Sequence, residues 1–346
     1  MTEPLATVLA SAFHANGEGA PAWRDVPADW GPLLAARGRT PDVDDEPPGE
    51  DDPALRVLGP HGRQLGAVLG AVHEAGGAAT LDRDAVGLFV ATDVVDPEPD
   101  DILPALRAST DKDGGFDLTR FFAGGFRSLH PLWPLAQLNN VAVGQVAIDL
   151  AVRGENAVFG SEADAGVRAL LEAAWSVQEG HTRAALVGAT APRAGAFAEA
   201  RAYVEGWPAD RPLGQGACAL LLGTSPAPRP RGAVSILAGT TGHGAGDDAT
   251  AWEDVIEHAL SSAGGPTPVV VHAPGEPALT EALGALGMAS IERRDLEAGV
   301  GHLGPASALA VLAVLDARPG DEPAGAHLLL VRGPNGGRGA LVLEVA

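Results

Sequence analysis

The sequence predicts an α/β protein in which two related halves pack as layers. Helical segments with one apolar face alternate with short apolar runs along most of the chain, as in sheets buried between helices. The same order then repeats. The apolar run at residues 86–92 corresponds to the run at 268–273, and the strand and helix from residue 157 correspond to the loop and helix around His302.

Composition sets the class of protein and excludes several functions. With 346 residues, 46% of them hydrophobic, the chain is long enough for two domains or one large duplicated domain. Its formal net charge of −22 argues against nucleic acid and anionic membranes as partners, because both bind basic surfaces. No apolar run has the length of a membrane span, and the N-terminal residues lack the basic flank of a secretory signal. The single cysteine, Cys218, excludes a disulfide framework and fits a reducing cytoplasm, the expected location.

The chain divides into three predicted parts. Residues 1–53 form a variable N-terminal segment, in which 5–13 is a first strand or a short helix. The acidic, proline-rich run at 42–53 is expected to be an exposed loop in the same segment. Residues 54–225 make the first α/β half, and residues 226–346 make the second.

Regular structure is expected from residue 54 onward. The first half should contain a helix at 57–75, a strand at 86–92, a helix at 100–109, a turn at 112–117, a non-helical stretch at 129–138, a helix capped by Asn139 and Asn140, a strand at 183–189 and a loop at 206–214. The second half should contain strands at 217–223 and 234–240 paired as a hairpin, a helix at 251–263, a strand at 268–273, a helix at 278–286, an apolar helix within 299–316, and strands at 326–332 and 340–345.

Residues 156–180 combine a short apolar strand, a sharp turn and a helix. The helix has one continuous apolar face, formed by Val167, Leu170, Leu171, Ala174 and Trp175. Such a turn presents a side chain at the helix N-terminus, where free N–H groups favour an anion or a nucleophile. The residues there include no cysteine, and Ser161 is the one hydroxyl nearby. The stretch therefore has the geometry of a nucleophile's turn without the nucleophile.

Motifs for nucleotide binding, hydrolysis and metal binding are missing. The sequence has no Walker A motif and no dinucleotide-binding glycine pattern between a strand and a helix. Gly160-Ser161 lacks the Gly-x-Ser-x-Gly spacing of a hydrolase. The histidines other than His272 and His302 show no metal-ligand spacing, so we expect neither a metal ion nor a cofactor.

Six segments resemble, in chain order, motifs of the β-ketoacyl synthase family. They are LHPLWPLAQLNNVAVGQVAIDLAVRGEN at 129–156, the strand and nucleophile turn at 156–170, PLGQGACALLLG at 212–223, VVVHAPGEP at 269–277, VGHLGPASALAVLAVL at 300–315 and GPNGGRGALVL at 333–343. The resemblance covers roughly residues 54–346. His272 stands where the family has its first catalytic histidine, and His302 where it has the second. This resemblance implies a thiolase-like layered αβαβα fold made of two related halves.

The departures from the family pattern concern the catalytic groups. The position of the nucleophilic cysteine falls on Ala163, which cannot form an acyl thioester. The usual lysine five residues before the second histidine is Glu297. Pro274 and Glu276 replace the threonines that follow the first histidine. Cys218 lies inside an apolar strand, where a buried structural cysteine is expected rather than a replacement nucleophile.

The resemblance therefore implies a non-condensing subunit, similar to the chain-length factors of type II polyketide or fatty-acid-like synthases. Such a subunit pairs with a catalytic ketosynthase, shapes the acyl tunnel and lacks the cysteine. The partner would be a ketosynthase or a second copy of this chain, with the strand at 157–161 at the two-fold axis. The acyl chain would arrive on an acyl carrier protein, for which Arg120 and Arg127 are candidate contacts.

A stand-alone enzyme is the alternative. Two neutral imidazoles, His272 and His302, could polarise a thioester carbonyl and stabilise an enolate without a cysteine. Decarboxylation, acyl transfer or dehydration of an acyl or malonyl thioester would then be the reaction. A third interpretation gives both histidines no catalytic role and has them held by local hydrogen bonds.

Overall fold

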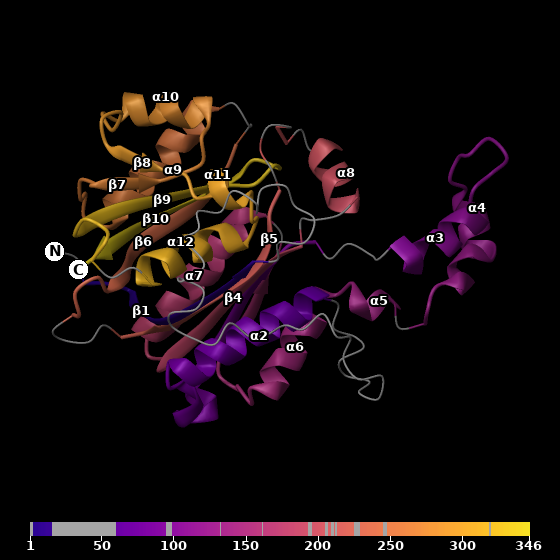
Figure 1. The fold of residues 1–346 in the computed structure, drawn as a ribbon, viewed down its shortest axis with the longest axis horizontal. Coiled ribbons are helices and arrows are strands. Elements are labelled where there is room, and N and C mark those ends of the chain that lie inside the picture. The colour runs from indigo at the N-terminus through magenta and orange to yellow at the C-terminus, as the bar shows by residue number, and fades with distance from the viewer. Residues whose placement is uncertain are drawn as a thin grey trace.

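One mixed sheet organises the molecule. The computed structural model describes residues 3–15, 60–94, 99–131, 133–160, 162–192, 196–204, 207–208, 211, 213–224, 229–244, 248–317 and 320–346. The loop expected at 42–53 lies outside these residues. Within them, ten strands are joined in the order β3-β2-β4-β5-β1-β6-β10-β9-β7-β8 (Figure 1).

The strands fall into two sets of five. The first set is β1 (Ala6–Ala15), β2 (Val86–Thr92), β3 (Asn156–Phe159), β4 (Ala184–Pro192) and β5 (Gln215–Gly223). The second set is β6 (Val234–His243), β7 (Val270–His272), β8 (Glu292–Arg294), β9 (Gly325–Arg332) and β10 (Gly337–Val345). All seven residues of β2 are buried, as the continuous apolar run predicts for a parallel strand covered on both faces.

The two sets have the same pairing pattern. In the first, β2 is parallel to β3 and β4, β4 is antiparallel to β5, and β5 is antiparallel to β1. In the second, β7 is parallel to β8 and β9, β9 is antiparallel to β10, and β10 is antiparallel to β6. Among the strands that the structure describes, the two sets join where Ala6 and Thr7 of β1 pair with Ile236 and Ser235 of β6. The repeat expected between the runs at 86–92 and 268–273 is confirmed, because β2 and β7 hold equivalent positions.

The helices cover the outer faces of the two strand sets and fill the space between the sets. They are α2 (Pro60–Ala75), α3 (Pro99–Ala108), α4 (Leu118–Ala123), α5 (Trp133–Ala136), α6 (Asn139–Asp149), α7 (Ala163–Gln178), α8 (Ala196–Val204), α9 (Ala249–Ser262), α10 (Pro277–Ala285), α11 (Glu297–Val300) and α12 (Ala306–Ala317), with 3₁₀ turns η3 (Ala78–Thr80), η4 (Arg83–Ala85) and η5 (Gly125–Ser128). An outer core joins α2 to the first strand set, and another joins α9 and α10 to the second. The inner core holds α7 and α12 between strands of both sets (Figure 1). The layered αβαβα fold of two related halves is therefore confirmed.

The inner layer is closely packed. In α12 every residue except Val314 and Ala317 is buried, which fits its almost continuous apolar sequence. Gly166 of α7 lies so close to the backbone of Pro305, just before α12, that a Cβ at this position would collide with the Pro305 carbonyl. The two helices approach this closely because residue 166 has no side chain.

Four sequence expectations about local structure need correction. The stretch at 129–138, expected to be non-helical, contains the single-turn helix α5. The strands β5 and β6 are not a hairpin, because β1 lies between them and pairs with both. Helix α6 has Leu138 as its N-cap, and Asn139 instead donates from Nδ2 to the Asp93 carbonyl over 3.4 Å. Trp175 is 39% exposed rather than buried with the apolar face of α7.

The elements that the sequence did not predict are short. Strand β8 contains only Glu292, Arg293 and Arg294, and α11 is a single turn. Helices α4 and α8 have six and nine residues. Segments this short contain too few residues for the spacing of apolar positions to distinguish them from loops. The first strand also starts in the segment 1–53, while the borders at 54–225 and 226–346 stay a prediction.

Among the described residues, none of the helices combines the length and apolarity that a membrane crossing needs.

The contact at Gly166 predicts a stability change. Gly166→Ala should lower the free energy of unfolding by about 1–3 kcal/mol, since the added methyl forces α7 away from Pro305. Gly144→Ala in α6 is the matched control, because no atom lies within 4 Å of the new methyl. It should raise stability by up to about 1 kcal/mol through helix propensity. Denaturant unfolding measures both, and a neutral Gly166→Ala would contradict the packing account.

Candidate functional site

The turn between β3 and α7 has a strained backbone at Glu162. Glu162, the N-cap of α7, has φ of 84°, a region that residues with a side chain seldom occupy. Its buried side chain lies against Gly333, in the glycine-rich turn between β9 and β10. Ala163 is the first residue of α7 and is fully buried. Ala163 is the residue that the family resemblance places at the nucleophile position, and its methyl group cannot attack a thioester.

His302 lies in a loop before α12 and is held from two sides. Its Nδ1 is 2.8 Å from Glu297 Oε1, to which Ser307 Oγ also donates over 2.7 Å. The Trp207 ring stacks on the imidazole with 4.2 Å between centroids and 30° between planes. His302 is 1% exposed, so these neighbours enclose it.

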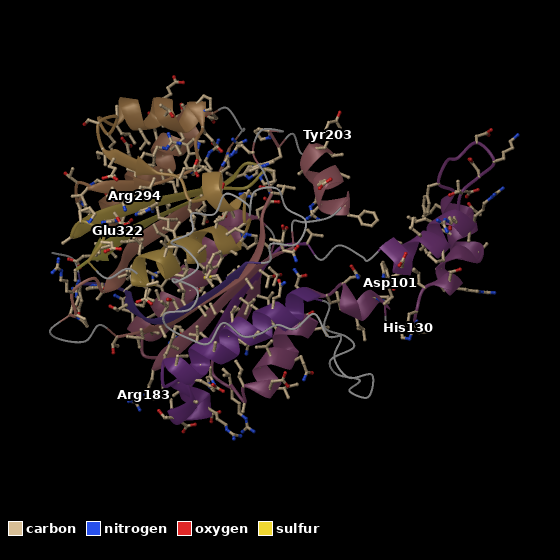
Figure 2. The ribbon with its side chains drawn as sticks, viewed as in Figure 1. Asp101, His130, Arg183, Tyr203, Arg294 and Glu322 are labelled. Atoms are coloured by element: carbon tan, nitrogen blue, oxygen red, sulfur yellow. The ribbon has the colours of Figure 1, made fainter. Side chains whose placement is uncertain are left out.

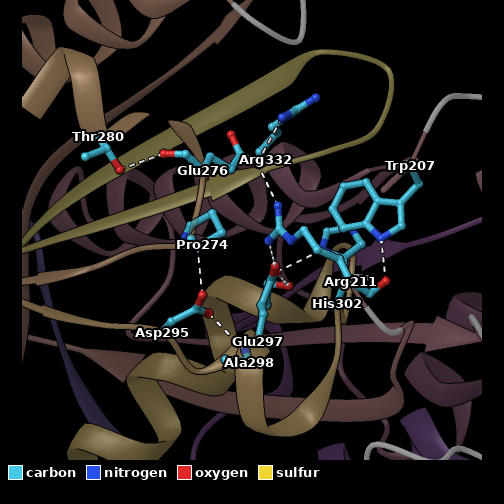
Figure 3. A network of polar contacts seen from close by, with 12 residues as sticks. Trp207, Arg211, Pro274, Glu276, Thr280, Asp295, Glu297, Ala298, His302 and Arg332 are labelled. Carbon is cyan, nitrogen blue, oxygen red and sulfur yellow. Dashed lines mark hydrogen bonds and ion pairs between the residues drawn. The ribbon is translucent and has the colours of Figure 1, made fainter. Parts of the chain in front are cut away.

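Arg211 connects the Trp207 side of the site to two glutamates. Its guanidinium lies 2.8 Å from Glu276 Oε1 and 2.9 Å from Glu297 Oε2 (Figure 3). The same guanidinium lies over the Trp207 ring, 4.7 Å from its centroid, and Trp207 Nε1 donates to the Arg211 carbonyl over 3.0 Å. Arg332 at the end of β9 adds a second cation 3.0 Å from Glu276 Oε1. The side chains of the chain itself thus fill the space around His302.

The charge on Glu297 is stabilised by this network. Burial opposes ionisation, but the His302 imidazole, the Arg211 guanidinium and the Ser307 hydroxyl together hold the pKa of Glu297 below its ordinary value. An ionised carboxylate facing Nδ1 fixes the proton of His302 on that nitrogen. Glu297 therefore orients the imidazole, whereas a lysine at this position would add a positive charge beside it.

His272 belongs to a second buried pair. Its Nε2 is 3.0 Å from Nδ1 of His327, whose Nε2 donates to the Pro323 carbonyl over 2.9 Å. The tautomers follow: His327 carries its proton on Nε2, and His272 donates from its own Nε2. Burial, then the neighbouring charges of His327 and Arg294, lower the pKa of His272 to about 3.

The His327 imidazole is also kept neutral. Its pKa lies below the ordinary value, because burial outweighs the Pro323 carbonyl and the carboxylates of Glu322 and Glu292. Arg294 forms ion pairs with both of these carboxylates. Figure 2 labels Arg294 and Glu322, which lie close together in that view. The pair of histidines therefore sits beside an ion-paired cluster on β8 and the loop before β9.

The sequence located part of this site and missed part of it. Glu297 and His302 are in contact, and Glu276, identified as the replacement of a threonine, joins the same network. The contacts described for His272 are with His327, so a joint catalytic role with His302 stays a prediction. Trp207, Arg211 and Arg332 were missed. The signal that could have found them is the glutamate in place of lysine, since a buried carboxylate requires a cation.

Two other possibilities from the sequence are a reactive Cys218 and a metal site. Cys218 is fully buried, and burial raises the pKa of its thiol, as expected for a structural cysteine. In the part of the chain that the structure describes, no group of three histidine, cysteine, aspartate or glutamate side chains comes together to hold a metal ion.

Comparison with known proteins identifies the fold. No protein-family model and no curated protein matches the sequence. A β-ketoacyl synthase from Burkholderia phymatum STM815 superposes with a TM-score of 0.72 at 12% identity, over 100% of both chains. A type II polyketide synthase acyl-carrier protein in complex with its ketosynthase, bound to the hexaketide, gives 0.71 at 13% identity, again over 100% of both chains. The ishigamide ketosynthase/chain length factor gives 0.59 at 22% identity, over 85% of this chain and 83% of that one. The protein therefore has the thiolase-like fold of β-ketoacyl synthases.

Removal of Arg211 tests the network. Arg211→Ala leaves the carboxylates of Glu276 and Glu297 without their shared cation and should lower the free energy of unfolding by roughly 3–5 kcal/mol. Arg120→Ala is the control, because its guanidinium is 53% exposed in a surface ion pair with Asp117 and should cost less than about 1 kcal/mol. Denaturant unfolding compares the two, and equal losses would contradict the network.

The histidine pair predicts acid sensitivity. Unfolded His272 takes up a proton near its ordinary pKa of 6.5, but the folded residue does so only near 3. The contribution of His272 to the free energy of unfolding is therefore fully present above pH 6.5. It falls as the pH drops from 6.5 to 3, by up to about 1.4 kcal/mol per pH unit. His272→Gln should make this fall shallower, whereas His258→Gln on the surface of α9 should not. Urea unfolding from pH 7 to 4 measures the slopes, and an unchanged slope in His272→Gln would contradict the assignment.

Proposed function

We propose that this chain is a non-condensing, chain-length-factor-like subunit that pairs with a catalytic ketosynthase of a type II polyketide or fatty-acid-like synthase. The observation that carries the proposal is the filled site. Ala163 stands at the start of α7 in place of a nucleophile, and Arg211, Glu276, Glu297 and Trp207 occupy the surroundings of His302. The fold is kept while the chemical groups for condensation are lost.

Condensation needs groups that this site cannot supply. A thiolate must first take up the acyl group, and Ala163 offers no atom for that bond. The malonyl carboxylate and the thioester carbonyl are then best stabilised by cationic or neutral hydrogen-bond donors. Glu297 instead adds a negative charge next to His302, and Arg211 is already engaged by two carboxylates. The catalytic role would therefore fall to the partner subunit.

Exposed apolar surface supports pairing with another subunit. β3 is an edge strand, and its Val158 side chain is 37% exposed. The arm formed by α3 and α4 projects from the body and exposes Phe122 (65%) and Phe126 (45%) (Figure 1). In a chain with net charge −22, residues 118–148 contain no aspartate or glutamate. The exposed apolar side chains within residues 118–148 are suited to burial in a large, obligate interface.

A carrier protein would approach on the same arm. Arg120 and Arg127 are the two arginines of residues 118–148, and Arg120 forms an exposed ion pair with Asp117. Acyl carrier proteins are acidic, so docking elsewhere on this surface would meet repulsion. Delivery of the acyl chain next to the partner subunit is consistent with a shared acyl tunnel.

The alternative is a stand-alone enzyme acting on an acyl or malonyl thioester. One observation favours it: His302 has a carboxylate on Nδ1, the arrangement that prepares an imidazole for general acid–base work. His272 would assist as the second imidazole. Decarboxylation, acyl transfer or dehydration would not require Ala163 to be a nucleophile.

A purification experiment distinguishes the two proposed functions. The chain is expressed alone and with each ketosynthase encoded beside it, then examined by light scattering and malonyl-thioester turnover. We expect a one-to-one complex with a cysteine-bearing ketosynthase and no turnover by this chain alone. Turnover by the isolated chain that is lost in both His302→Ala and His272→Ala would establish the alternative. His181→Ala, an exposed histidine, controls for nonspecific loss.

A further inference from the structure

A groove of about 550 Å³ runs beside the outward face of α7. We call it the β6 groove. Its lining residues come from the start of β1 and from β3, α7, β6 and α9: Leu5, Phe159, Arg168, Leu171, Glu172, Trp175, Leu237, Ala238, Gly239, Thr240, Thr241, His258 and Ser262. None of them belongs to the network around His302, so the groove is separate from the candidate site.

The floor of the groove is an unpaired strand edge. β1 pairs with β6 only at Ser235 and Ile236, and β10 pairs with β6 along its other edge as far as His243. In the part of the chain that the structure describes, no strand continues beside β6 from residue 237 to 243. An open strand edge presents backbone donors and acceptors at two-residue spacing and readily takes another strand.

The wall of the groove offers an aromatic anchor. Trp175 is 39% exposed, although twelve of the sixteen residues of α7 are buried. Phe159 and Leu171 lie with it along the groove. A half-exposed tryptophan next to apolar neighbours is the type of residue that dominates the binding energy of an interface.

We propose that the β6 groove receives an extended segment of the paired ketosynthase subunit, which adds to β6 as a strand and places an apolar side chain against Trp175. The inference rests on the proposed function. A polypeptide fits the floor, because main-chain hydrogen bonds along a strand edge give affinity while side-chain pockets give specificity. The seven residues from 237 to 243 span roughly 23 Å, enough for a segment of similar length.

Charge favours a different subunit over a second copy of this chain. Each copy carries −22, so two copies would bring 2 × −22 = −44 together. Like charge of this size slows association and weakens the complex. Within the groove Arg168 is already paired with Asp164 of its own helix, which leaves Glu172 to face the incoming chain. The segment that binds is therefore apolar with a basic or neutral flank.

Hydrogen–deuterium exchange tests the contact directly. The chain is measured alone and in its purified complex with the ketosynthase, and the amides of residues 239–243 are followed. We expect their exchange to slow at least tenfold in the complex. Unchanged exchange in an intact complex would overturn the groove assignment and leave the proposed function standing. Failure to form a complex with any neighbouring ketosynthase would instead overturn the proposed function.

Variants test the same contact through affinity. Trp175→Ala removes the anchor, and Thr241→Trp fills the groove with a bulky ring. Both should weaken the complex at least tenfold while the isolated variants keep the melting temperature of the parent. Tyr203→Ala, an 85% exposed aromatic residue on α8 outside the groove, should bind as the parent does (Figure 2). Equal affinity for all three variants would overturn the inference. So would protection of residues 239–243 that grows with the concentration of this chain alone, since the occupant would then be a second copy.

Discussion

The burial of α7 and α12 between the two strand sets is the constraint from which the arrangement of the molecule follows. Gly166 allows one helix to touch the backbone ahead of the other, and the apolar sequence of α12 makes it stable only where strands or helices surround it. Packing these helices fixes where their first residues lie. Ala163 and Ser307 come from segments that are remote in sequence, yet both enter the inner layer because the two halves repeat one topology.

The buried carboxylate of Glu297 explains much of the chemistry around His302. A carboxylate buried beside an imidazole and a hydroxyl is stable only with a cation near it. Arg211 supplies that cation, and its position over the ring keeps Trp207 against His302. The Glu297 carboxylate and the Arg211 guanidinium therefore form an ion-paired core around His302.

The sequence was sufficient to predict the helices, the strands and their layers. It was insufficient to predict which elements and side chains lie next to one another. Long apolar runs such as β2 and periodic helices such as α2 were predicted, because burial dictates their pattern. The hairpin of β5 with β6 was wrong, since pairing across the sheet is decided by β1, a strand from the other end of the chain. The same limit applies to the site. His302 and Glu297 are five residues apart and could be read together, whereas Arg211 joins them only through tertiary packing.

A closed core and open edges point to a division of roles in the molecule. The inner layer is buried, so little of it is available to a substrate. The edges of β3 and β6, with Trp175 between them, keep apolar atoms and strand backbone in contact with solvent at a cost in stability. That cost is offset when another polypeptide covers these surfaces. Under the proposed function, the exposed residues of this chain provide contacts with a partner, and bond-making takes place on the partner subunit.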